Sequence, residues 1–261
     1  MGKLRFLFRY LHHYFTAGTE HGLHSPFVYE LYSQTIRPKK IYYPFHAIEK
    51  LRKELLRSSE TIQVVDYGAG SQVERGSLRP ISSIARHSEK SPVLAQLIFK
   101  LVDHFQPAVV LDLGTSLGIT TLYESFAREQ ATIYTFEGCP NTARIALRNF
   151  HRLKRKNINL IEGNIDNTLP ALLPKISKID FVFFDANHRF EPTINYFNIC
   201  LSKAHEYSVF IFDDIHWSEE MEQAWEKIKA DERVTLTIDL FYIGLVFFRK
   251  KQPKQDFKLK V

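Results

Sequence analysis

VVLDLGTSLG, residues 109–118, joins a short apolar strand to a turn with two glycines, and a helical pattern follows over residues 119–128. Glycines let the backbone approach a ligand at the carboxyl end of a parallel strand, and the start of the helix offers free amide groups. The spacing is G-x-x-x-G, so the third glycine of the dinucleotide fingerprint G-x-G-x-x-G is missing. The stretch predicts a strand–turn–helix unit with a ligand site at the end of the strand.

The alternation of strand and helix continues along the chain. Further apolar runs lie at 132–136, 158–163, 179–185, 207–213, 234–239 and 241–249. Helical connections and near-continuous apolar strands are typical of a parallel sheet covered on both faces. The last two runs are almost adjacent, so they predict a hairpin whose second strand runs antiparallel to its neighbours. The expected fold class is α/β with a mostly parallel sheet.

Helical patterns dominate residues 1–106. Apolar residues recur at helical spacing between positions 4 and 15, with basic residues and histidines between them. Such a helix either lies at a membrane interface or, as we favour, packs on its own domain or on a second subunit. Ser25-Pro26 predicts the start of another helix. The stretch TIQVVDYGAGS, residues 61–71, ends in a glycine turn that on its own is only a weak sign of a ligand pocket.

Composition excludes several classes of protein. The 261 residues include 21 Phe and 12 Tyr, too many for a disordered chain, and two cysteines, too few for a disulfide scaffold or a multi-cysteine zinc module. The longest apolar run, residues 240–248, is far shorter than the ~20 residues that span a bilayer. The N-terminus lacks the pattern of a signal peptide. We therefore expect a cytoplasmic protein without a transmembrane segment.

The net charge of +6 comes from the two ends of the chain. Residues 1–9 carry +3 and residues 249–261 carry +5, which leaves −2 for residues 10–248. A basic globular surface is therefore not expected, and the case for a nucleic-acid partner is weak. The lysine-rich tail, residues 251–261, is expected to be disordered.

Glu137 ends the second strand of the alternating region. A carboxylate at this position suits a ribose diol, which has two hydroxyl donors to offer it. Glu137 and the glycine turn end consecutive strands, so together they predict a site for a ligand that contains a ribose.

With these two motifs, residues 107–250 resemble a class I S-adenosylmethionine-dependent methyltransferase. DLGTSLG, residues 112–118, matches the first motif of that family, and TFEGCP, residues 135–140, matches the second. The resemblance implies a Rossmann-like sheet of seven mostly parallel strands with an antiparallel last strand. It also implies that Thr120 lies near the methionine carboxylate and that Asn164 borders the adenine, although many relatives have Asp there. The implied S-adenosylmethionine-binding residues are Asp112, Gly114, Thr115, Ser116, Gly118, Thr120, Glu137, Gly138, Asn164, Ile165 and Asp185.

Three carboxylates follow the fourth and fifth strands: Asp185, Asp213 and Asp214. The ends of these strands are neighbours in a doubly wound sheet, on the same edge as the cofactor turn. Like charges at close range need neutralisation, and Mg²⁺ or a similar divalent cation is the simplest means. The sequence therefore predicts a metal site made of these three residues.

The same residues resemble the catechol O-methyltransferase-like branch, in which an Asp and an Asp-Asn pair bind one metal. Asp214 stands where that branch usually has Asn, and His188 stands where relatives often have Lys. The resemblance implies that the metal holds a substrate hydroxyl and that His188 and Asp185 are the catalytic residues, with His188 as the base. His216 and Trp217 are further candidates for the wall of the acceptor pocket.

The predicted function is S-adenosylmethionine-dependent O-methylation of a small hydroxylated acceptor with divalent-metal assistance. Two alternatives remain open: an RNA (tRNA) methyltransferase that uses the basic ends for phosphate contact, and a non-catalytic cofactor-binding or docking protein. The predicted organisation is a helical extension over residues 1–106, a methyltransferase domain over 107–250 and a basic tail over 251–261. A homodimer is a further expectation.

Overall fold

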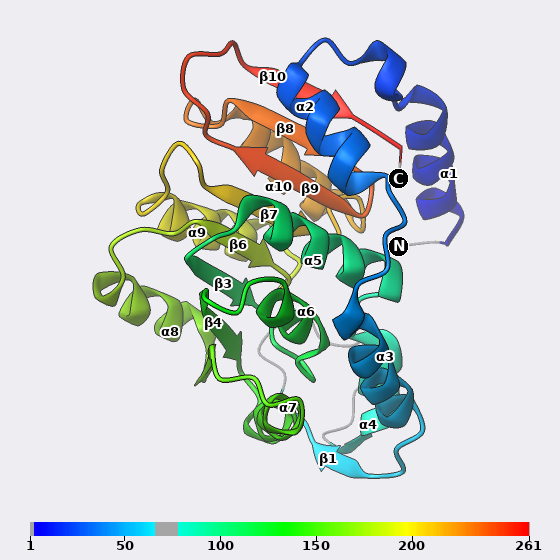
Figure 1. Ribbon diagram of the computed structural model, residues 1–261, viewed down its shortest axis with the longest axis vertical. Helices are drawn as coiled ribbons and strands as arrows, with labels where there is room; N and C mark the ends of the chain where they lie inside the picture. The colour runs from blue at the N-terminus through cyan, green and yellow to red at the C-terminus, as the bar shows by residue number, and fades with distance from the viewer. Residues whose placement is uncertain (1–2, 66–77, 261) are drawn as a thin grey trace. The chain divides into compact units, whose positions relative to one another are not determined.

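The computed structural model describes residues 3–65 and 78–260, which form two compact units (Figure 1). The middle unit spans Lys39–Leu172, and the terminal unit combines Met1–Pro38 with Leu173–Val261. The glycine turn at residues 66–71 lies outside the described residues. Because the two units divide the chain at other positions, the domain boundaries after residues 106 and 250 remain predictions.

The middle unit contains three parallel strands, hydrogen-bonded in the order β3-β4-β5. They are β3 (Val109–Leu113), β4 (Thr132–Glu137) and β5 (Ile158–Glu162). The helices are α3 (Tyr43–Leu56), α4 (Ile81–His87), α5 (Pro92–Phe105), α6 (Ile119–Ala127), α7 (Pro140–Arg152) and α8 (Ile165–Leu172). A separate antiparallel pair consists of β1 (Thr61–Gln63) and β2 (Leu78–Pro80).

Helices α3, α4 and α5 share one hydrophobic core with α6 and α7. Phe45 of α3 lies edge-on to Phe99 of α5, with ring centroids 4.9 Å apart, and 5.3 Å from the ring of Tyr123 in α6. Local signals set the start of α5, where the Ser91 hydroxyl accepts a hydrogen bond from the Leu94 amide and proline follows directly. The helical lead-in thus supports the helix that follows the glycine turn.

The terminal unit contains five strands in the order β10-β8-β9-β7-β6. They are β6 (Phe181–Phe184), β7 (Val209–Asp213), β8 (Leu236–Asp239), β9 (Ile243–Phe247) and β10 (Gln255–Lys258). Its helices are α1 (Lys3–Thr16), α2 (Pro26–Leu31), α9 (Phe190–Leu201) and α10 (Glu219–Ala230), with short turns of other helix types at Glu20–Gly22, Tyr32–Ile36 and Leu173–Lys175. The predicted hairpin is confirmed, because β9 runs antiparallel to both β7 and β8. Gly244 of β9 is a glycine for reasons of packing, because a Cβ there would come within 2.6 Å of the Trp225 ring of α10.

The predicted fold class is confirmed: an α/β, Rossmann-like architecture with mostly parallel strands and an antiparallel β9. An eighth strand, β10, joins the seven expected ones and pairs in parallel with β8. The expectation of a disordered tail is therefore wrong for residues 255–258. Leu259 is fully buried, and its amide donates to the Asp239 carbonyl, so the lysine-rich composition hid a strand and the buried leucine that follows it.

A buried polar network attaches α1 to the rest of the terminal unit. His13 Nε2 lies 3.0 Å from Asp239 Oδ1, and His216 Nε2 lies 2.9 Å from Asp239 Oδ2. On its other side, His216 Nδ1 lies 3.1 Å from Glu222, whose second oxygen pairs with Arg9 at 2.6 Å. These contacts form one network that runs from His13 through Asp239, His216 and Glu222 to Arg9, and we call it the α1 anchor. It joins α1, the β8–β9 hairpin, the loop after β7 and α10.

The α1 anchor shifts the pKa of two of its members. Burial alone would raise the pKa of Asp239, but the hydrogen bonds from His13 and His216 outweigh burial and hold that pKa below its ordinary value. Burial would lower the pKa of His216, but its bonds to Asp239 and Glu222 outweigh this effect and raise that pKa. The anchor stabilises the fold most when Asp239 is ionised and His216 is protonated.

We predict that Leu259→Ala lowers the free energy of unfolding by about 2–4 kcal/mol, because it empties a fully buried leucine site. Urea unfolding followed by circular dichroism measures the loss. Lys250→Ala, at an exposed position of the same tail, is the control and should change the free energy by less than about 0.5 kcal/mol. Equal effects of the two substitutions would contradict the packing of the tail.

We predict that Asp239→Asn costs about 3 kcal/mol of stability near pH 6, because it breaks a buried ion-paired network. Because the pKa of His216 is raised in the folded state, protonated His216 stabilises the fold fully below about pH 6.5. This stabilisation is lost as the pH rises through the pKa of His216 in the folded protein. The deficit of the variant should therefore be smaller at pH 9, as urea unfolding at both pH values would show. Glu226→Gln, in an exposed pair with Lys229, is the control, and a pH-independent deficit would contradict the network.

Candidate functional site

The loop between β3 and α6 in the middle unit has the backbone geometry that the glycine spacing predicts. Gly114 and Gly118 have φ values of 122° and 84°, and Ser116 between them also lies in the left-handed region at 49°. Gly118 is required by packing, because a Cβ there would lie 2.4 Å from the Phe150 ring of α7. The loop therefore turns sharply into the first turn of α6 and presents backbone amides at the end of β3.

Glu137, at the end of β4, is held by backbone amides on both of its oxygens. The Ser116 amide donates to Oε2 and the Cys139 amide donates to Oε1, each at 2.9 Å. A carboxylate oxygen can accept a second hydrogen bond, so Glu137 can also bind hydroxyl groups. The side chain is fixed against the glycine loop in the middle unit, where the sequence predicts the ribose of a ligand.

Three of the expected cofactor residues have buried side chains under this loop. Asp112 is fully buried and accepts hydrogen bonds from the Thr121 hydroxyl at 2.5 Å and the Thr135 hydroxyl at 2.8 Å. The Thr115 hydroxyl lies 2.5 Å from that of Thr135, and the side chain of Thr120 is also buried. The observed contacts of Asp112 and Thr115 hold β3, β4 and α6 together, and a cofactor contact at these positions remains a prediction.

The end of β5 lies beside Glu137. Glu162 is its register partner, and the Gly163 amide donates to the Glu137 carbonyl at 2.9 Å. Asn164 caps the first turn of α8, since its side-chain oxygen accepts from the Asp166 amide, and Ile165 begins that helix. The structure thus brings Gly138, Asn164 and Ile165 close to Glu137 along neighbouring strand ends.

Glu89 is a neighbour of the loop that sequence reasoning missed. Its Oε1 accepts a hydrogen bond of 2.8 Å from the Leu117 amide, one residue after the amide that binds Glu137. Glu89 lies between α4 and α5, 28 positions before Leu117, and no motif marks it. Its part in the site follows only from the packing of the helical lead-in on α6.

The middle unit fits a ribose-containing cofactor on two observations. Glu137 is fixed on the glycine loop, and the Ser116 hydroxyl oxygen is buried with no hydrogen-bond partner in the part of the chain that the structure describes. A buried hydroxyl without a partner is costly unless a ligand or water completes its hydrogen bonds. The loop therefore offers a donor and acceptor next to the carboxylate.

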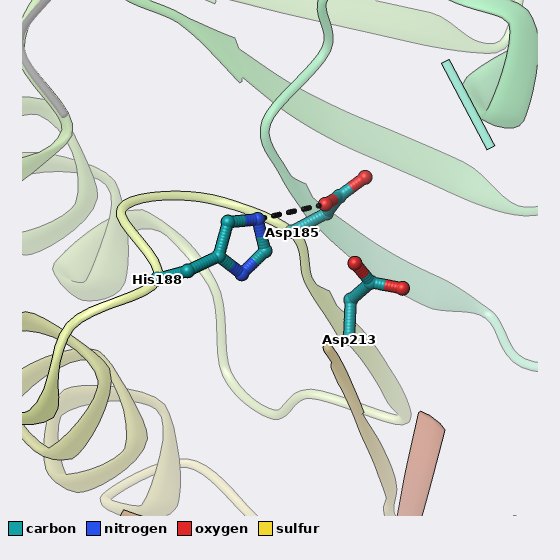
Figure 2. Close-up of side chains that lie close together, drawn as sticks. All are labelled: Asp185, His188 and Asp213. Atoms are coloured by element: carbon teal, nitrogen blue, oxygen red, sulfur yellow. Dashed lines mark ion pairs between the residues drawn. The ribbon is translucent and has the colours of Figure 1, made fainter. Parts of the chain in front are cut away.

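The terminal unit brings together Asp185, His188 and Asp213, drawn in Figure 2. One ligand atom from each residue lies within 4.8 Å of the others. Asp185 and His188 follow β6, with His188 Nε2 3.4 Å from Asp185 Oδ1, and Asp213 is the buried last residue of β7. Two carboxylates and an imidazole are a donor set that accepts a divalent cation.

Asp214 does not join this cluster, which differs from the predicted set of three aspartates. Its backbone is left-handed, with φ of 54°, and its amide donates to the Tyr242 carbonyl at 2.7 Å. Nor does Asp214 cap α10, because the Ser218 hydroxyl accepts from the Met221 amide at 3.1 Å. His188 belongs to the cluster, with its Nε2 3.4 Å from Asp185 Oδ1, and its role as a base remains a prediction.

His216 and Trp217, the candidates for a pocket wall, have other contacts. His216 belongs to the α1 anchor through Asp239 and Glu222. Trp217 is half-exposed and lies edge-on to Phe6 of α1, with ring centroids 5.9 Å apart. The structure therefore places both residues against α1, and their role toward an acceptor remains a prediction.

Solved structures with a similar fold include several methyltransferases. The O-methyltransferase from Bacillus cereus, in complex with SAH, is 18% identical with a TM-score of 0.57, over 84% of this chain and 96% of that one. The O-methyltransferase TomG from Streptomyces achromogenes, in complex with SAM, is 20% identical with a TM-score of 0.54, over 62% and 82%. The SAH-bound methyltransferase PaMTH1 from Podospora anserina is 13% identical with a TM-score of 0.56, over 82% and 100%. No curated protein matches the sequence of this chain.

The sequence itself matches a family described as "Methyltransferase domain" over residues 111–215. This range contains the glycine loop, Glu137, Asn164, Asp185, His188, Asp213 and Asp214. Residues 111–215 therefore match a methyltransferase family, and the solved structures confirm the class I methyltransferase fold that the sequence resembles.

Proposed function

We propose that the protein is an S-adenosylmethionine-dependent O-methyltransferase that methylates a small hydroxylated acceptor with the help of a divalent cation. The observation that carries the proposal is Glu137, held by the Ser116 and Cys139 amides on the glycine loop of a methyltransferase domain. Neighbours of the same fold support it, because those from B. cereus and S. achromogenes are O-methyltransferases in complex with SAH and SAM.

The middle unit would bind the cofactor. Glu137 accepts the two ribose hydroxyls with its carboxylate oxygens, and its bonds to backbone amides hold the side chain in one orientation. The methionine part would lie along the loop from Gly114 to Gly118, whose amides face the end of β3. Residues 163–165 border the adenine at the adjacent strand end.

The terminal unit would prepare the acceptor. When bound, S-adenosylmethionine would supply the methyl group, and a divalent cation held by Asp185 and Asp213 would lower the pKa of a substrate hydroxyl. His188 either completes this ligand set or accepts the hydroxyl proton at Nε2, which lies 3.4 Å from the Asp185 carboxylate. Such a cation would also offset the cost of burying the Asp213 carboxylate.

We predict that Glu137→Gln weakens the binding of S-adenosylhomocysteine by tenfold or more, because it removes a charge-assisted acceptor of the ribose hydroxyls. Isothermal titration calorimetry measures the affinity. Glu162→Gln is the matched control, since Glu162 is the register partner of Glu137 on β5 and is exposed. Similar affinities for both variants, with melting temperatures unchanged, would contradict the assignment of Glu137 to the cofactor site.

We predict that the wild-type protein binds Mn²⁺, a spectroscopic substitute for Mg²⁺, and that Asp213→Asn weakens this binding at least tenfold. Asp214→Asn should leave it unchanged, because Asp214 lies outside the cluster of Asp185, His188 and Asp213. Titration followed by electron paramagnetic resonance measures bound Mn²⁺. An equal loss of Mn²⁺ affinity in both variants would support a site made of Asp185, Asp213 and Asp214. Absence of Mn²⁺ binding by the wild type would contradict the metal site.

A further inference from the structure

Helix α1 exposes an apolar and aromatic face. Leu7, Phe8, Leu11, Tyr14 and Phe15 are all exposed, with Phe8 and Phe15 at 74% and 77% of their full surface. Their positions, i, i+1, i+4, i+7 and i+8, form one continuous stripe on a helix. Single exposed apolar residues are ordinary, but a contiguous stripe with two almost fully exposed phenylalanines marks an interaction surface. We call these five side chains the α1 face.

The α1 face is held outward by the opposite side of the helix. Phe6 and Tyr10 pack on the Phe241 ring, with centroids 5.3 Å and 5.1 Å away, and His13 and Arg9 belong to the α1 anchor. These contacts fix the rotation of the helix about its axis. The exposed stripe therefore cannot turn inward without breaking a buried ion-paired network.

The basic tail lies directly beside this helix, although the two are separated by more than 230 positions. Gly18 after α1 pairs in parallel with Leu259 after β10, so the end of the chain lies beside α1 (Figure 1). Lys260 Nζ lies 4.4 Å from the centre of the Tyr14 ring. Residues 249–261 carry a net charge of +5. The structure thus joins the two basic ends of the sequence and places a positive tail at the edge of the α1 face.

The acidic groups next to α1 do not offset this charge. Glu219 pairs with Arg5, and Glu222 pairs with Arg9 and His216. An apolar stripe of leucine and phenylalanine beside a lysine-rich chain end is the chemistry of a helix that lies in the interface of an anionic bilayer. No described helix is long and apolar enough to cross a membrane, so the contact would be peripheral.

We propose that the α1 face and the basic chain end at residues 258–260 dock the protein on an anionic phospholipid surface. The phenylalanines and leucines enter the boundary between headgroups and acyl chains, and Lys258 and Lys260 bind the phosphate groups. A second copy of the chain fits this surface less well, because a two-fold interface through α1 would bring two tails of +5 together. A nucleic acid fits less well too, since the stripe holds aliphatic side chains and few cations.

The test is co-sedimentation of the full chain with phosphatidylcholine vesicles that contain 30% phosphatidylglycerol, and with pure phosphatidylcholine vesicles. We expect binding only to the anionic vesicles, weakened several-fold by 0.5 M NaCl. Phe8→Ser with Phe15→Ser should reduce the affinity about tenfold, and Lys258→Gln with Lys260→Gln should do the same. Tyr207→Ser is the matched control, because Tyr207 is 74% exposed but lies outside α1.

Three results would overturn the proposal. The first is the absence of wild-type binding to anionic vesicles. The second is a dimer by light scattering that Phe8→Ser with Phe15→Ser converts to a monomer, which would assign the α1 face to a second copy. The third is binding of fluorescent tRNA that the same double variant weakens. Thermal melting of each variant separates loss of docking from loss of folding.

Discussion

Two backbone amides on one carboxylate tie the methyltransferase motifs into a single structure. Ser116 belongs to the loop after β3 and Cys139 to the loop after β4, and Glu137 accepts from both. These bonds need the left-handed turn at Ser116 and the glycines beside it, and they need β3 and β4 to end in register. The fold therefore sets the position of the one acid that a ribose would use, and the buried Asp112–Thr121–Thr135 contacts hold the strands beneath it.

The sequence predicted those parts of the fold that depend on local signals. The buried strands, the cap at Ser25, the hairpin around Gly244 and the glycine loop all follow from patterns within a few residues. β10 was missed because lysines alternate with its inward residues, so the composition resembled a solvated tail. Its burial depends on Asp239 and Gly18, which lie about 20 and 240 positions away.

The candidate site divides in the same way. The sequence predicted Glu137, Asp185 and Asp213 as site residues, because an apolar run that ends in a carboxylate can be recognised from the residues alone. The sequence did not show that Asp214 lies outside the cluster of Asp185, His188 and Asp213. The turn at Asp214 depends on a hydrogen bond to the carbonyl of Tyr242 in the next hairpin. Glu89 reaches the glycine loop from the helical lead-in, and only the packed core shows this contact.

The net positive charge of the protein comes from residues outside the proposed cofactor and metal sites. Residues 10–248 are slightly acidic, and a few of their carboxylates form the proposed cofactor and metal sites, while the two basic ends meet beside α1. The α1 anchor links these regions physically, because His216 follows β7, which ends in Asp213, and also holds α1. Catalysis and docking would thus use different surfaces of one chain.

The most direct test of the central claim is a crystal structure of the protein grown with S-adenosylhomocysteine. The account predicts the ribose hydroxyls within hydrogen-bond distance of Glu137 and the homocysteine part along the loop from Gly114 to Gly118. Electron density for the ligand elsewhere, with Glu137 bound only by its two amides, would contradict it.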